Sequence, residues 1–142
     1  QNLLELRRSL QAYYLALATN PHPSLEAQKN QVEENAFVLK VRGIIEEHLS
    51  DSALDVEQLC RKVGMSNSQL HRKLTALTGY SANRFVRYIR LTKACTLLQQ
   101  DSNLTIVAVA YDCGFNDPVY FARAFRQEFG VSPSEWRSIK PG

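Results

Sequence analysis

The chain of 142 residues is 44% hydrophobic and 22% charged, a composition typical of a globular domain and not of a disordered segment. It lacks a secretory signal and any run of about 18 apolar residues, so we expect no membrane contact, and its net charge of +3 is too small to identify a partner. Its three cysteines, Cys60, Cys95 and Cys113, are widely spaced, which predicts buried thiols in a reducing compartment, the cytoplasm.

Residues 1–34 are predicted to form an amphipathic helix followed by a linker. Apolar side chains recur at helical spacing in the first 18 residues: Leu3, Leu6, Leu10, Tyr13, Tyr14 and Leu17. Pro21 and Pro23 end this helix, because proline lacks an N–H donor and disfavours helix in the residue before it. The polar stretch from Leu25 to Asn35 fits either a linker or a weak helix, so we place the compact domain at residues 35–142.

Residues 35–142 are predicted to be all-α, with seven helices and no strand. An apolar stripe from Phe37 to Leu49 indicates the first helix. Capping residues mark the start of each of the other six: Asp55, Ser66, Ser81, Thr105, Asp117 and Ser132. Glycine follows four of those six, at Gly64, Gly79, Gly114 and Gly130. The longest runs from Ser81 to about Gln100.

A unit of two short helices joined by a tight turn occurs twice. Shifts of 50 and then 51 residues align the two copies, pairing Asp55 with Thr105, Gly64 with Gly114, Arg72 with Arg123 and Gly79 with Gly130. In a helix-turn-helix motif the second helix enters the DNA major groove. We therefore expect recognition helices at about residues 66–78 and 117–129. The long linker helix between them, about 30 Å in length, would hold them about one turn of DNA apart.

The charge is unevenly distributed along the chain. It sums to −2 up to Leu54 and to +5 after it, and the 43 residues from Gln58 to Gln100 contain no acid. Their basic residues are Arg61, Lys62, Arg72, Lys73, Arg84, Arg87, Arg90 and Lys93. An acid-free basic segment favours phosphate binding. The alternatives are a solvated cationic surface, or a helical protein-interaction module whose basic face binds an acidic partner.

A wider set of residues carries a family pattern: Gly64-Met65-Ser66, Gln69-Leu70-His71-Arg72, Thr78-Gly79, Arg90-Leu91, Gly114-Phe115, Tyr120-Phe121, Phe129-Gly130, Ser132-Pro133 and Trp136-Arg137. This pattern resembles the DNA-binding domain of the AraC/XylS family of bacterial transcription regulators, over about residues 37–140. The resemblance implies two helix-turn-helix motifs and control of transcription, usually activation through RNA polymerase. The residues from Asn2 to Gln11 look like the end of a receiver domain and its connector, as in the C-terminal part of a hybrid two-component response regulator.

The first recognition helix is predicted to present polar residues away from the core. These are Asn67, Ser68, His71 and Arg72, with Lys73 as a phosphate candidate. By the family pattern Ser68, His71 and Arg72 reach base edges, and Arg72 suits the bidentate contact with guanine O6 and N7. A surface histidine without a role is the alternative for His71.

The second recognition helix is predicted to bury phenylalanines and to present Val119, Ala122, Arg123 and Arg126. Arg123 corresponds to Arg72 and is the second candidate for base reading, while Val119 and Ala122 suit a thymine methyl group. Arg126, Arg84 and Arg87 are phosphate candidates or solvated surface charges.

No catalytic or metal-ligating motif is found in the sequence, so we expect neither an enzyme nor a cofactor. The predicted partner is double-stranded DNA, with RNA polymerase implied by the family. The leucine-striped first helix, or domains upstream of it, is a candidate for forming a homodimer or for transmitting a signal from a receiver.

Overall fold

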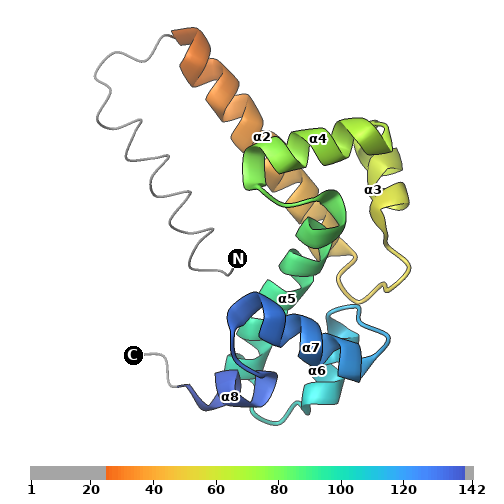
Figure 1. The fold of residues 1–142 in the computed structure, drawn as a ribbon, viewed down its shortest axis with the longest axis vertical. Coiled ribbons are helices and arrows are strands. Elements are labelled where there is room, and N and C mark those ends of the chain that lie inside the picture. Colours follow the sequence, from red (N-terminus) through yellow and green to blue (C-terminus); the bar gives the residue numbers. More distant parts are fainter. Residues whose placement is uncertain (1–24, 140–142) are drawn as a thin grey trace.

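The computed structural model describes residues 25–139, and within this range it contains seven helices and no strand (Figure 1). The helices are α2 (Leu25–Glu47), α3 (Val56–Val63), α4 (Asn67–Thr78), α5 (Ala82–Gln100), α6 (Ile106–Asp112), α7 (Pro118–Phe129) and α8 (Pro133–Ser138). The predicted all-α fold is confirmed. The helix predicted over residues 1–18 lies outside the described residues. None of the seven helices is long and apolar enough to span a membrane.

The predicted N-caps begin the helices from α3 to α8. Three of the predicted glycines are C-caps, Gly64 of α3, Gly79 of α4 and Gly130 of α7, whereas the C-cap of α6 is Cys113, one residue before Gly114. Asp55, Ser81, Thr105 and Ser132 each accept a hydrogen bond from a backbone N–H in the first turn of the helix that follows. These bonds satisfy N–H groups that have no partner within the helix. Four glycines have a positive φ, which other residues rarely adopt, at Gly64, Gly79, Gly114 and Gly130.

Helix α2 is longer than the sequence indicates. It begins at Leu25 and continues without a break through residue 35, so the stretch interpreted as a linker or a weak helix is helical. Its early part leaves Val32 and Leu39 about two thirds exposed, whereas Val41 and Ile45 are fully buried. The packed part of α2 therefore starts in its second half.

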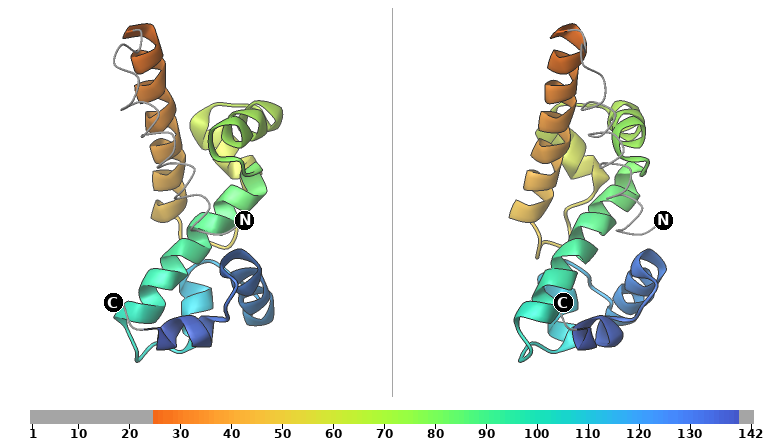
Figure 2. Two further views of the ribbon diagram at one scale, coloured as in Figure 1. Left: turned by 60° about the vertical axis from the view of Figure 1, so that its left-hand side comes forward. Right: turned by 90° about the vertical axis from the view of Figure 1, so that its left-hand side faces the viewer.

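The buried residues form two clusters that meet along α5. The first joins α2, α3 and α4 to the first half of α5, through residues such as Ile45, Leu59, Leu70, Leu74 and Phe85. The second joins α6, α7 and α8 to the second half of α5, through residues such as Leu91, Leu98, Val109, Phe121 and Phe125. The two units thus lie toward opposite ends of one helix, and both views in Figure 2 show α4 and α7 on the same side of it.

Arg90 corrects one part of the prediction that the basic residues between Gln58 and Gln100 favour phosphate binding. It belongs to that segment, but it is only 5% exposed and lies between the two units. Its guanidinium donates to the carbonyl oxygens of Leu49, Asp51, Leu54 and Cys113. Burial lowers the pKa of this guanidinium. Arg90 therefore joins the α2–α3 loop to the α6–α7 turn and is not available to phosphate.

The three cysteines are free and buried, as the sequence predicted for all of them. Burial raises the pKa of Cys95 and that of Cys113 to about 12 from an ordinary value of 9.0, because a thiolate loses its hydration there. Both thiols stay protonated at neutral pH and are unsuited to nucleophilic chemistry.

Candidate nucleic-acid interface

The first recognition helix, α4, is fixed at both its start and its inner face. Ser66 and Gln69 form a capping box, with Gln69 N donating to Ser66 Oγ at 3.2 Å and Ser66 N donating to Gln69 Oε1 at 3.0 Å. Leu70 and Leu74 are fully buried. These contacts determine which side of α4 faces away from the protein.

The outward side of α4 carries the residues that the sequence predicted. Asn67, Ser68, His71 and Arg72 are all exposed, and together they line one shallow, open depression on the surface. Lys73 is also exposed, but its Nζ lies 4.3 Å from the centroid of the Phe37 ring, over α2. An aromatic ring face attracts a cation, so this contact holds the Lys73 ammonium beside α2. Lys73 is therefore at the edge of the surface formed by Asn67, Ser68, His71 and Arg72.

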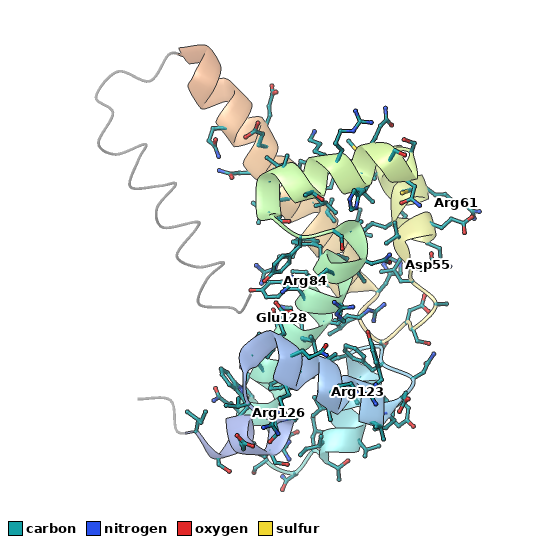
Figure 3. The ribbon with its side chains drawn as sticks, in the orientation of Figure 1. Asp55, Arg61, Arg84, Arg123, Arg126 and Glu128 are labelled. Atoms are coloured by element: carbon teal, nitrogen blue, oxygen red, sulfur yellow. The ribbon has the colours of Figure 1, made fainter. Side chains whose placement is uncertain are left out.

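The second recognition helix, α7, repeats this arrangement. Asp117 Oδ1 accepts from Val119 N at 2.9 Å, and the next residue, Pro118, occupies the first helical position. Phe121 and Phe125 are fully buried. Val119, Arg123 and Arg126 are exposed and Ala122 is half-buried, and Figure 3 shows both arginines on α7.

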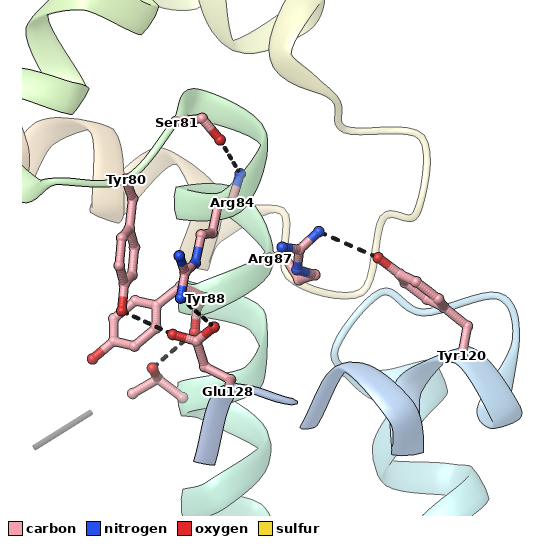
Figure 4. Close-up of polar contacts among 8 residues, drawn as sticks. Tyr80, Ser81, Arg84, Arg87, Tyr88, Tyr120 and Glu128 are labelled. Carbon is pink, nitrogen blue, oxygen red and sulfur yellow. Dashed lines mark hydrogen bonds and ion pairs between the residues drawn. The ribbon is translucent and has the colours of Figure 1, made fainter. Parts of the chain in front are cut away.

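Two other predicted phosphate contacts lie at the junction of the units (Figure 4). Arg84 Nη2 is 3.4 Å from Glu128 Oε2 on α7, and its guanidinium carbon is 4.3 Å from the centroid of the Tyr80 ring. Arg87 Nη1 donates to the hydroxyl oxygen of Tyr120 at 3.4 Å. Both side chains thus extend from α5 to α7 and are only partly exposed to solvent.

Sequence reasoning missed Glu128 and Tyr80, which meet at this junction. Glu128 is 4% exposed and accepts a hydrogen bond from the Tyr80 hydroxyl at 2.8 Å. A signal was present, since Glu128 is seven residues after Phe121 and so falls on the buried stripe of α7. Burial, followed by the hydrogen bond to Glu128, raises the pKa of Tyr80.

The geometry defines a class of protein, the double helix-turn-helix. Two capped helices that carry exposed polar and basic side chains lie on the same side of a long connecting helix, and each follows a short helix. Within residues 25–139 no group of three or more His, Cys, Asp or Glu side chains is placed to hold a metal ion.

Comparison with known proteins identifies the family. Residues 59–139 match the family model of a helix-turn-helix domain. A probable AraC family transcriptional regulator from Rhodopseudomonas palustris is 32% identical, with a TM-score of 0.60 over 70% of this chain and 93% of that one. The DNA-binding domain of the transcriptional factor AdpA, solved in complex with a target DNA, is 31% identical, with a TM-score of 0.64 over 71% of this chain and 89% of that one.

The chain belongs to the AraC/XylS family of helix-turn-helix DNA-binding domains. This is a family of transcription regulators and not of enzymes. The chain also matches histidine kinase P4 from Formosa agariphila, with 30% identity over 138 residues, which are 97% of this chain and 10% of that protein. It therefore spans a small part of a much longer relative. Solved C-terminal domains of response regulators share the fold as well.

Proposed function

We propose that this chain is the sequence-specific DNA-binding module of a transcription regulator, which inserts α4 and α7 into successive major-groove segments of double-stranded DNA. The observation that carries the proposal is the placement of two recognition helices on one side of α5. With 19 residues, α5 is about 28 Å long, close to the pitch of about 34 Å that separates successive major-groove segments on one face of DNA.

The exposed side chains suit different parts of the DNA. On α4, Arg72 is assigned to a guanine, with Ser68 and His71 reading neighbouring bases and Asn67 at the rim. Lys73, held beside α2, is assigned to the phosphate backbone. The capped start of α4 adds backbone N–H groups that favour phosphate.

On α7 the equivalent base reader is Arg123, with Val119 and Ala122 placed for a thymine methyl group. Arg126, near the end of the helix, is assigned to phosphate. Arg87 remains a phosphate candidate because it is only half-buried. Arg84, which is paired with Glu128, is assigned to the contact between the units instead.

The whole protein is proposed to be a cytoplasmic hybrid two-component regulator. The match to a histidine kinase over 97% of this chain supports that placement, as does the likeness to C-terminal domains of response regulators. Contact with RNA polymerase is proposed from the family. A homodimer formed through residues 1–18 or through upstream domains would bring two such modules to one operator.

Selection of bound sites from random duplex DNA tests the proposal directly. We expect two short motifs about one DNA turn apart, and binding that weakens with salt. If about six phosphates are neutralised, log K against log salt has a slope near −5. Absence of duplex binding at low salt, together with capture of an acidic protein, would refute the proposal and favour the protein-interaction module.

A further inference from the structure

Glu128 is a buried acid on a helix proposed to read DNA. It lies on the face of α7 that carries Phe121 and Phe125, away from the side that presents Arg123 and Arg126. A carboxylate buried without partners is strongly unfavourable, so the groups around it indicate why an acid occupies this position.

Within the described residues, the two side chains that bond to the Glu128 carboxylate come from outside the second unit, Tyr80 from the α4–α5 turn and Arg84 from the first turn of α5. The Tyr80 hydroxyl donates to Oε1 at 2.8 Å, and Arg84 Nη2 lies 3.4 Å from Oε2. Tyr80 itself is 1% exposed, and its ring packs edge-on against Tyr88 with centroids 5.2 Å apart. The carboxylate is therefore held at both oxygens by side chains that are fixed in turn.

Tyr80 is attached to the end of α4. Its backbone N–H donates to Thr78 Oγ1 at 3.1 Å, and its carbonyl oxygen accepts from Thr75 Oγ1 at 3.3 Å. Two sets of contacts therefore connect α4 with α7. Threonine side chains of α4 bond to the backbone of Tyr80, and the Tyr80 hydroxyl bonds to Glu128 on α7. Otherwise α4 packs mainly on α2, α3 and α5, whereas α7 packs mainly on α6 and α8.

We infer that the contact of Glu128 with Tyr80 and Arg84 fixes the angle between α4 and α7, and thereby the separation of DNA half-sites that the chain accepts. This inference rests on the proposed DNA-binding function. One inserted base pair moves the second half-site by about 3.4 Å along the duplex and about 35° around it. If the angle between α4 and α7 is fixed, the two helices cannot both enter the displaced half-sites. If the contact is weakened, α7 can change its orientation and partly reach the second half-site.

Two variants weaken the contact in different ways. Tyr80→Phe removes only the hydroxyl, and Glu128→Gln removes the charge while keeping the shape of the side chain. Ile45→Val is the matched control, because it loosens the buried cluster beneath the first unit while leaving all three side chains of the contact unchanged. Each protein is titrated with duplexes that carry the selected half-sites at the natural separation, or with one base pair inserted or deleted.

The preference is the ratio of Kd on the altered duplex to Kd on the natural one. We expect this ratio to fall about five-fold in both variants, because losing one hydrogen bond changes an equilibrium constant by about that factor. In Ile45→Val the preference is expected to stay unchanged. Unchanged preference in both contact variants, at melting temperatures similar to that of the control, would overturn the inference and leave the contact a purely structural one.

Spin labels measure the angle without DNA. Cysteines introduced at the exposed positions Ala76 and Gln127 report the separation of α4 and α7, while the native thiols are buried. We expect a broader distance distribution in Tyr80→Phe and Glu128→Gln than in the control, and an unchanged distribution would overturn the inference. A wild-type chain without sequence-specific binding would overturn the proposed function instead, while the label distances would still decide whether the contact fixes the angle.

Discussion

Arg72→Ala is expected to weaken binding to the selected DNA site while leaving the fold intact. Arg72 is exposed on α4 and has no intramolecular hydrogen bond or ion pair in the described part of the chain. Its removal should therefore change the free energy of unfolding by less than about 0.5 kcal/mol. A bidentate contact with guanine is worth about 1–3 kcal/mol, which corresponds to about a 5- to 160-fold increase in Kd.

The assay compares affinity across a panel of duplexes in which each base pair of the first half-site is varied in turn. For Arg72→Ala we expect discrimination to disappear at one base pair and to remain at the others. Arg61→Ala is the matched control, because it removes the same charge from the neighbouring helix α3, where Arg61 is highly exposed and pairs with Glu57 at 2.9 Å. That control should change affinity by a similar factor on every duplex, with a change in salt slope of about 1 at most.

The outcome separates base reading from phosphate contact at Arg72. An equal loss of affinity on all duplexes would assign the guanidinium to the phosphate backbone. Unchanged affinity together with unchanged site preference would refute its role in recognition. Circular dichroism melts of both variants provide the check that neither result reflects unfolding.

Three further predictions concern the second unit, and one of them uses Gly64 of the first unit for comparison. Arg123→Ala should relax base preference in the other half-site only, measured on the same duplex panel. Gly114→Ala should destabilise the fold by about 2–5 kcal/mol and Gly64→Ala by only about 1 kcal/mol, as measured by urea unfolding. Both glycines have positive φ, but a Cβ at position 114 would stand within 2.6 Å of Arg90 Cζ, whereas open space surrounds position 64. The pKa of Cys113 is about 12 in the folded state and near 9.0 in the unfolded state, so the free energy of unfolding should fall as pH rises above about 9. Cys113→Ala should lessen that fall, as measured by denaturant titrations from about pH 8 to about pH 10.5.

The helix boundaries from α3 onward could be predicted because their causes are local. Ser66 and Gln69 bond to one another across three residues, and Gly79 ends α4 through a backbone bond to Thr75. Such contacts form wherever the sequence places these residue types together. The exposed side of α4 follows for the same reason, since Leu70 and Leu74 mark the buried side by helical periodicity.

The roles of the basic residues could not be predicted in the same way. Arg72, Arg84 and Arg90 all belong to one acid-free segment, yet they lie on an open surface, beside Glu128 and within the core, respectively. The groups that distinguish them are far away in sequence, 44 residues for the carboxylate beside Arg84 and 36 to 41 residues for the α2–α3 loop carbonyls around Arg90.

The sequence by itself therefore determined the helices from α3 onward, the repeated motif and the side of each recognition helix that faces away from the core, because contacts within one or two turns decide these features. Only the tertiary structure decided which cations remain available to DNA and how the two motifs are joined. Those properties depend on long-range partners such as Tyr80 and Glu128, 48 residues apart, whose meeting follows from the packing of both units on one helix.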